Sequence, residues 1–262
     1  QAEAGTLVRW PDPPGEVLPI CADTQVTLFV AEGLLQAMYR CFHRGVFHPQ
    51  TKLLYALRRW LETQGYNMDR VDPWRDRFGG WLIGVSGLHA RRNPDRVTLH
   101  VISKRQVGYD DKPVNDSQGC GAVVRSAPFG LLAEDPWAAY NVSLTSAIVT
   151  HGNPAATLPA GFFSGLIQLL VQGRSLAIAI DEMRTMISGY PGHEIVDGAL
   201  LLARQLAANN ESDLQNLARL GKGWRGHEAL AMALYCAQKY EQDIERGVRV
   251  AASHGGNAAG TA

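Results

Sequence analysis

The stretch Gly226–Tyr240, GHEALAMALYCAQKY, shows most clearly which kind of fold this sequence specifies. Leu230, Ala233 and Leu234 recur at three- and four-residue spacing, so they share one face of an α-helix. The same periodicity appears from Asp23 onward and recurs along the rest of the chain. It predicts further helices over residues 51–63, 137–150, 158–172, 174–187, 194–208, 213–220 and 241–252.

Few segments depart from this helical pattern. Arg96–Ser103, RVTLHVIS, alternates weakly between apolar and polar residues and favours a short strand. The prolines of RWPDPPG block a helix, so we expect residues 1–20 to be irregular. Residues 65–95 are rich in Gly, Pro, Asp and Arg and are predicted to form loops. The sequence therefore predicts an all-α fold in a single domain that covers residues 1–262.

Composition and charge argue against several classes of partner. The chain has 262 residues, 46% of them hydrophobic, and a formal net charge of +0. A neutral chain has no field that attracts nucleic acid or an anionic membrane, so we expect neither as a partner. Its longest apolar runs, such as FFSGLIQLLV, have about half of the roughly 20 residues that a membrane span needs.

The cysteines bear on the cellular compartment. Cys21, Cys41, Cys120 and Cys236 are widely spaced and form no CxxC pattern. No charged start followed by an apolar stretch suggests a secretory signal. We therefore expect buried, unpaired thiols and a cytoplasmic location.

The carboxylate of Asp23, in PICADTQVTLFVAEGLL, has two interpretations. An aspartate directly before a helix commonly accepts a backbone N–H as the N-cap. Alternatively, it is held there for a hard cation. Residue type alone favours the cap and leaves both hypotheses open.

Three glycine-rich segments are further candidates for a site. In NDSQGCGAVVR, Gly119 and Gly121 permit a tight turn or the approach of an anion to backbone N–H groups, and Arg125 is expected to pair with an acid. His151, in VTHGNPAA, is expected to pack or to cap the end of a helix. The last segment, SHGGNAAGTA, has Asn257 where a charged residue would be expected, and it also fits a simple helix stop.

Taken together and in order, these segments resemble the ADP-ribosylglycohydrolase family. The family motifs read approximately (S/T)DDTQMTLFTAEGLL, NDSKGCGAVMRVAPVGL, THGHP, LGEGWVAEEALAIALYCAL and HGGDSDSTGA. The chain has CADTQVTLFVAEGLL, NDSQGCGAVVRSAPFGLL, THGNP, LGKGWRGHEALAMALYCAQ and HGGNAAGTA. The resemblance extends from residue 20 to the last residue. It implies a single all-α, orthogonal multi-helix domain, here without the first and last helices of the family.

The resemblance also implies a chemistry. Active members of the family cleave ADP-ribose from an acceptor side chain, with two Mg²⁺ or Mn²⁺ ions between the first and last motifs. Paired metals of this kind orient hydroxyl groups and activate water. Carried over position by position, Asp23 is the only certain carboxylate that remains where the family has four. The other ligand positions hold Cys21, Ala22, Asn257 and Ala259, with Gly260 or Thr261 at the position of the hydroxyl ligand.

The positions that face ADP-ribose in the family are better preserved. They are Asn115, Asp116, Ser117, Gly119, Cys120, Gly121 and His151. Phe129 and Trp224 are aromatic residues near these motifs, and we expect core packing for both rather than contact with an adenine.

Three hypotheses about function follow. The first is an ADP-ribosylglycohydrolase-like protein that binds ADP-ribose or an ADP-ribosylated partner, with weak or no hydrolysis and weak or absent Mg²⁺ or Mn²⁺. The second is an active metal-dependent hydrolase, with Asp23 as the catalytic residue and further acids recruited from elsewhere. The third is a helical scaffold without a nucleotide site. The acids that the second hypothesis has available are Glu32, Asp110, Asp111 and Asp116.

Overall fold

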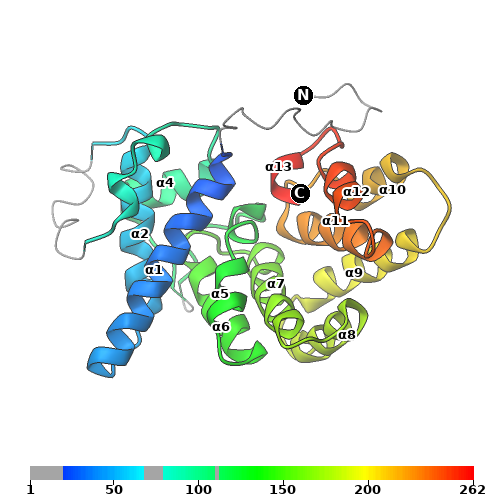
Figure 1. Ribbon diagram of the computed structural model, residues 1–262, viewed down its shortest axis with the longest axis horizontal. Helices are drawn as coiled ribbons and strands as arrows, with labels where there is room; N and C mark the ends of the chain where they lie inside the picture. Colours follow the sequence, from blue (N-terminus) through cyan, green and yellow to red (C-terminus); the bar gives the residue numbers. More distant parts are fainter. Residues whose placement is uncertain (1–19, 68–78, 110–111) are drawn as a thin grey trace.

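The protein is built from α-helices (Figure 1). The computed structural model describes residues 20–67, 79–109 and 112–262. The helices are α1 (Ala22–Arg44), α2 (Pro49–Thr63), α4 (Arg96–Lys104), α5 (Ala127–Leu132), α6 (Pro136–Ile148), α7 (Pro154–Val171), α8 (Leu176–Ile187), α9 (His193–Ala207), α10 (Asp213–Leu220), α11 (Gly226–Lys239), α12 (Ile244–Ala251) and α13 (Ala258–Thr261), with the short 3-10 helices η2 (Leu82–Gly84), η3 (Ser86–Leu88) and η4 (Cys120–Ala122). Within the described part of the chain there are isolated β-bridges and no strands. The all-α prediction is confirmed.

Capping residues set the helix boundaries, and they correct three of the predicted ones. The helix expected over 158–172 begins at Pro154, because Asn153 accepts a hydrogen bond from the Ala155 N–H and proline suits the first helical position. The helix expected over 241–252 begins at Ile244, because Asp243 caps it. The helix from Asp23 begins one residue earlier and has Cys21 as its N-cap, so the N-cap interpretation of Asp23 is wrong.

The strand expected over Arg96–Ser103 is also wrong, because this segment forms α4. Its β-branched residues alternate only weakly. Thr98, Leu99, Val101 and Ile102 are buried, at the three- and four-residue spacing of one helical face. The Asp95 carboxylate then caps the helix by accepting from two backbone N–H groups. Burial of this face therefore decides the local structure over β-propensity.

The helices pack as two groups joined by α5–α7 (Figure 1). On one side, α1, α2 and α4 enclose a core that includes Phe29, Leu57, Trp60 and Ile102. On the other side, α8 to α12 pack against α7 and one another. α1 and α2 approach closely at Gly33, where an added Cβ would lie 2.9 Å from the Ala56 Cβ. In this arrangement the beginning of α1 and the helix α13 line the same cleft.

α7 is the central helix of this arrangement. It is the one helix in the described ranges that is long and apolar enough to cross a membrane, with a mean hydropathy of 1.4 over 18 residues. Of that window, 72% is buried within the structure, so its side chains pack against other helices. Pro159 lies inside α7 and removes one backbone donor near its start.

The cysteines are only partly as expected. All four are free thiols. Cys120 and Cys236 are buried, as predicted, whereas Cys41 is exposed and Cys21 is partly exposed. The expectation of burial is wrong for the last two, because Cys41 lies on the outer face of α1 and Cys21 precedes its first turn.

Candidate functional site

Segments from the first, second and last motifs come together at one cavity of ≈ 380 Å³, which we call the site cavity. It is lined by Asp23, Asn93, Pro94, Asp95, Arg96, Gly119, Cys120, Gly121, Trp224 and Asn257. A second cavity of ≈ 330 Å³ shares Asp23 and extends between Cys21 and Ala259. A larger one of ≈ 1040 Å³ lies at the far end of α1 and is lined by none of the candidate site residues, so size alone does not identify the site.

Asp23 projects from the first turn of α1 and lines both of these smaller cavities. Its side chain forms no hydrogen bond or ion pair with the described residues. Burial raises the pKa of its carboxyl group, the negative charge of Asp95 raises it further, and the positive charge of Arg125 opposes both effects. The carboxyl group therefore lies in the two smaller cavities without a bonded partner among the described residues.

The last motif directs its polar atoms into the protein. Asn257 caps α13, because its Oδ1 accepts from the Gly260 N–H at 3.3 Å. Its Nδ2 lies 2.9 Å from the Cys120 sulfur, and burial raises the pKa of that thiol to about 12. The Thr261 hydroxyl donates to the Ala251 carbonyl at 3.0 Å. These groups are engaged in holding the turn against its surroundings.

The loop of residues 115–121 is held by its own side chains. Asn115 accepts from the N–H groups of Ser117, at 2.9 Å, and Gly152, at 3.2 Å, and it donates to the Thr150 carbonyl at 2.9 Å. The Gly119 N–H donates to the Ser117 hydroxyl at 3.2 Å. These bonds tie the loop to the end of α6.

Two further contacts complete this loop. The carboxylate of Asp116 accepts from Asn153 at 2.5 Å. The Cys120 N–H donates to the Trp224 carbonyl at 2.9 Å. In the loop that the sequence predicts as a possible anion site, the N–H groups of Gly119 and Cys120 are therefore bonded to protein acceptors.

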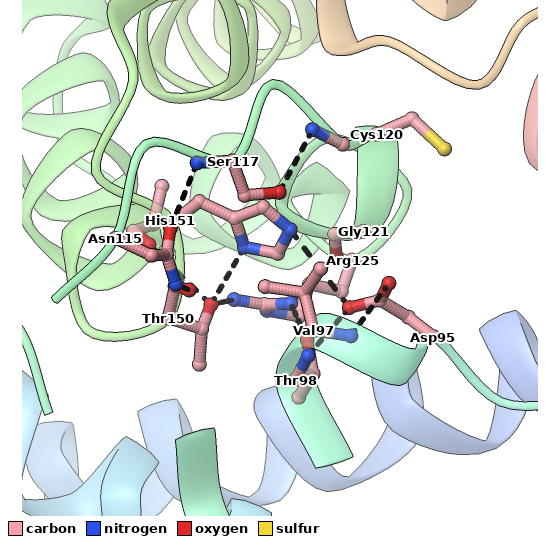
Figure 2. A network of polar contacts seen from close by, with 12 residues as sticks. Asp95, Val97, Thr98, Asn115, Ser117, Cys120, Gly121, Arg125, Thr150 and His151 are labelled. Atoms are coloured by element: carbon pink, nitrogen blue, oxygen red, sulfur yellow. Dashed lines mark hydrogen bonds and ion pairs between the residues drawn. The ribbon is translucent and has the colours of Figure 1, made fainter. Parts of the chain in front are cut away.

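The buried Arg125 and His151 form a polar network behind the loop together with the partly exposed Asp95 (Figure 2). Arg125 is 2% exposed and donates to the Gly121 carbonyl at 2.6 Å and the Thr150 hydroxyl at 2.6 Å. It forms no ion pair with a carboxylate in the described residues, contrary to expectation. Burial lowers the pKa of its guanidinium group to about 10, and the charges of Asp95 and Asp23 oppose this shift.

His151 is fully buried beyond the end of α6, which makes packing, and not a positive charge at the helix terminus, its role here. Burial lowers the pKa of its imidazole to about 4, so the ring is neutral at pH 7. Its Nδ1 lies 2.9 Å from the Thr150 hydroxyl. Its Nε2 has no hydrogen-bond partner among the residues that the structure describes, and it lies 3.8 Å from the Asp95 carboxylate.

The remaining candidates divide between core and surface. Phe129 is 2% exposed and belongs to the core, as predicted, whereas Trp224 is 56% exposed at the rim of the site cavity, so core packing is wrong for it. Glu32 is buried in an ion pair with Arg59 and also accepts from the Leu82 N–H at 2.9 Å. Asp110 and Asp111 lie outside the described residues.

Sequence reasoning missed Asp95. The signal was an aspartate directly before an amphipathic segment, which is a typical N-cap pattern. It was not recognised because the segment after it was interpreted as a strand.

The structure is an all-α protein with a cavity formed by residues at helix ends and in the loops between helices. The family model for ADP-ribosylglycohydrolase matches residues 4–262, and the chain therefore belongs to that family. This confirms the family resemblance stated from the motifs. The family acts on ADP-ribosylated substrates and is generally metal-dependent. No curated protein matches the sequence.

Proposed function

We propose that the chain is an ADP-ribosylglycohydrolase-like protein that binds ADP-ribose or an ADP-ribosylated partner in the site cavity and hydrolyses it weakly or not at all. The observation that carries the proposal is the set of side chains where the family places its metal ligands. Asp23 supplies the one carboxylate there, while Ala22 and Ala259 end in methyl groups. Asn257 supplies a neutral amide whose atoms are already hydrogen-bonded.

These residues do not fit a centre of two dications. Mg²⁺ prefers six oxygen ligands that include well-placed carboxylates. The Cys21 sulfur is a soft metal ligand, which Mg²⁺ does not favour. It already accepts a hydrogen bond from the Thr24 N–H at 3.4 Å as the cap of α1. In the described part of the chain, no group of three or more His, Cys, Asp or Glu side chains is placed to hold a metal ion. We therefore derive no step of hydrolysis through a metal.

The contribution of the chain's own residues is binding. The site cavity of ≈ 380 Å³ has the polar side chains Asn93, Asn257 and Asp95 in its walls and the Trp224 indole at its rim. An exposed aromatic ring beside polar groups suits a nucleoside, because the ring stacks on the base and the polar groups bind hydroxyls.

The four free thiols support a second proposal, a cytoplasmic location.

One observation favours the alternative, an active metal-dependent hydrolase. Asp95 gives the site cavity a second carboxylate beside Asp23. Release of free ADP-ribose from a modified protein distinguishes the two functions. The alternative requires release that EDTA and Asp23→Ala abolish, whereas our proposal expects little or no release under any of these conditions.

Calorimetry tests the binding claim directly. We expect heat of binding with ADP-ribose and none with Mg²⁺ at concentrations that saturate a two-metal centre. Ligand at 100 times its dissociation constant stabilises the folded state by about 2.7 kcal/mol, which a thermal-shift assay detects. Absence of both heat and thermal shift with ADP-ribose would favour the scaffold hypothesis. Tight Mg²⁺ binding would contradict our proposal.

Restoring the missing acids is a sharper test of the metal argument. Ala22→Asp, Asn257→Asp and Ala259→Asp together supply carboxylates at the three family positions, and we expect Mg²⁺ affinity to increase. Ala258→Asp is the matched control, since it adds a charge in the same turn at a position that is no ligand in the family. A folded triple variant whose Mg²⁺ affinity equals that of the control would refute the assignment of these positions.

A further inference from the structure

The carboxylate of Asp95 occupies the positive end of α4. Its Oδ1 accepts from the Val97 N–H at 3.3 Å, and its Oδ2 accepts from the Thr98 N–H at 2.8 Å. Free N–H groups and the helix dipole make such a terminus favourable for an anion. In this protein the anion is part of the chain.

A second and independent feature faces the same carboxylate. His151 is fully buried. In the described part of the chain its Nε2 has no hydrogen-bond partner, and it lies 3.8 Å from Asp95 Oδ2. The Thr150 hydroxyl accepts from Arg125, and its own proton has two acceptors within reach, of which His151 Nδ1 at 2.9 Å is much closer than the Ala147 carbonyl at 3.4 Å. The neutral ring then carries its proton on Nε2. This places an unsatisfied donor toward Asp95.

The surroundings add positive charge and leave no spare space. The buried Arg125 guanidinium donates to the Thr98 hydroxyl at 3.1 Å and to the Gly121 carbonyl at 2.6 Å, so it lies beside the start of α4. A Cβ added to Gly121 would lie 2.5 Å from Asp95 Oδ2, which shows how closely the carboxylate packs against the loop. Two backbone donors and an imidazole N–H thus face the Asp95 carboxylate, and the Arg125 guanidinium adds a positive charge nearby (Figure 2).

We propose that Asp95 is an internal anion that fills an anion-binding hole in the wall of the site cavity and so determines which ligands the cavity accepts. The hole is formed by the start of α4, His151 and Arg125. While Asp95 occupies it, a ligand that brings a phosphate to this wall meets a like charge. Without the charge of Asp95, the dipole of α4 and the positive charge of Arg125 attract phosphate to this wall of the cavity. The inference rests on the proposed function in that the site cavity is the ligand site.

The test removes the charge and keeps the cap. Asp95→Asn retains an oxygen that accepts from the N–H groups of α4, since asparagine is as good an N-cap as aspartate. Asp135→Asn is the matched control, because Asp135 caps α6 by accepting from the Ala138 N–H at 2.8 Å and is exposed away from the site cavity. If Asp95→Asn does not fold, Asp95→Ser supplies the cap instead.

The probe is inorganic phosphate, and its binding is measured by calorimetry at pH 7.5. One neighbouring charge changes the equilibrium of a charged group by about 1–3 log units, so we expect Asp95→Asn to bind phosphate at least about tenfold more tightly than the native chain and Asp135→Asn. Phosphate is also expected to shift the imidazole ¹H–¹⁵N signals of His151 in Asp95→Asn. Equal phosphate affinity in all three proteins, or tighter binding without a shift at His151, would overturn the proposal.

ADP-ribose in the same experiment separates the two claims. Binding to the native chain with no gain in Asp95→Asn refutes the inference and leaves the proposed function standing. Binding of phosphate by Asp95→Asn, with no binding of ADP-ribose by either protein, refutes the proposed function and supports the anion hole.

Discussion

Removal of the Arg125 guanidinium is the perturbation whose effect follows most directly from the structure. Arg125 is 2% exposed and donates at 3.1 Å to Thr98, 2.6 Å to Gly121 and 2.6 Å to Thr150, so one side chain joins α4, the loop of residues 115–121 and the end of α6. Arg125→Met retains the apolar stem and removes every donor. The Gly121 carbonyl then loses this partner inside the protein.

The magnitude follows from opposing effects. Hydrogen bonds to a charged group contribute roughly 1.5–3 kcal/mol each, which gives about 4.5–9 kcal/mol for three. Burial of the guanidinium opposes folding by several kcal/mol, and the variant no longer incurs that cost. We therefore expect the free energy of unfolding to decrease by about 3 kcal/mol. For a chain of this size, such a change lowers the melting temperature by roughly 6–12 °C.

Urea denaturation followed by far-UV circular dichroism measures this loss. Arg184→Met is the matched control, because Arg184 is bidentate with Asp197, at 2.6 Å and 3.2 Å, on the surface of α8 and α9. A partly exposed pair of this kind contributes about 1 kcal/mol or less. Arg125→Met and Arg184→Met with the same stability would refute the view that Arg125 holds the site together.

Two further predictions concern buried polar groups. Tyr140→Phe should leave the free energy of unfolding unchanged or raise it, because the buried Tyr140 hydroxyl has no hydrogen-bond partner within residues 20–67, 79–109 and 112–262. Tyr235→Phe should lower the free energy of unfolding by roughly 1–3 kcal/mol, because the Tyr235 hydroxyl donates to Asp213 at 2.6 Å. Calorimetric melting compares the pair, and equal effects would contradict the assigned partners. Burial lowers the pKa of His151 to about 4, so in the unfolded chain the imidazole takes up a proton at higher pH than in the folded one. The stability that His151 contributes is therefore present above pH 6.5 and lost as the pH falls towards 4. Chemical denaturation over this pH range should show the free energy of unfolding declining more steeply in the native chain than in His151→Gln. Parallel pH dependences in the two proteins would exclude a neutral buried ring.

Most helices could be predicted because apolar spacing alone determines the buried face. The helix α10 occupies Asp213–Leu220, as the sequence predicts, since Ser212 is a strong cap and the apolar residues are regular. The segment Arg96–Ser103 was misinterpreted, because its β-branched residues favour a strand and the core that buries one helical face is formed by distant helices. The residues of this segment alone do not show which distant helices will bury one of its faces.

The site was predictable only in part, and for the same reason. The order of the motifs identified Asp23, Asn257 and the loop of residues 115–121 as candidates, and all of them line or adjoin one cavity. The partners of these groups depend on folding: Asn257 meets Cys120 across 137 positions of sequence. Asp95 was missed because a cap is recognised only together with its helix.

Diffraction from crystals grown with excess Mn²⁺ tests the central claim most directly, because Mn²⁺ scatters anomalously and can be located without ambiguity. The account predicts no anomalous peak between Asp23 and Asn257. Two Mn²⁺ ions at full occupancy in that cleft, each with oxygen ligands, would contradict it.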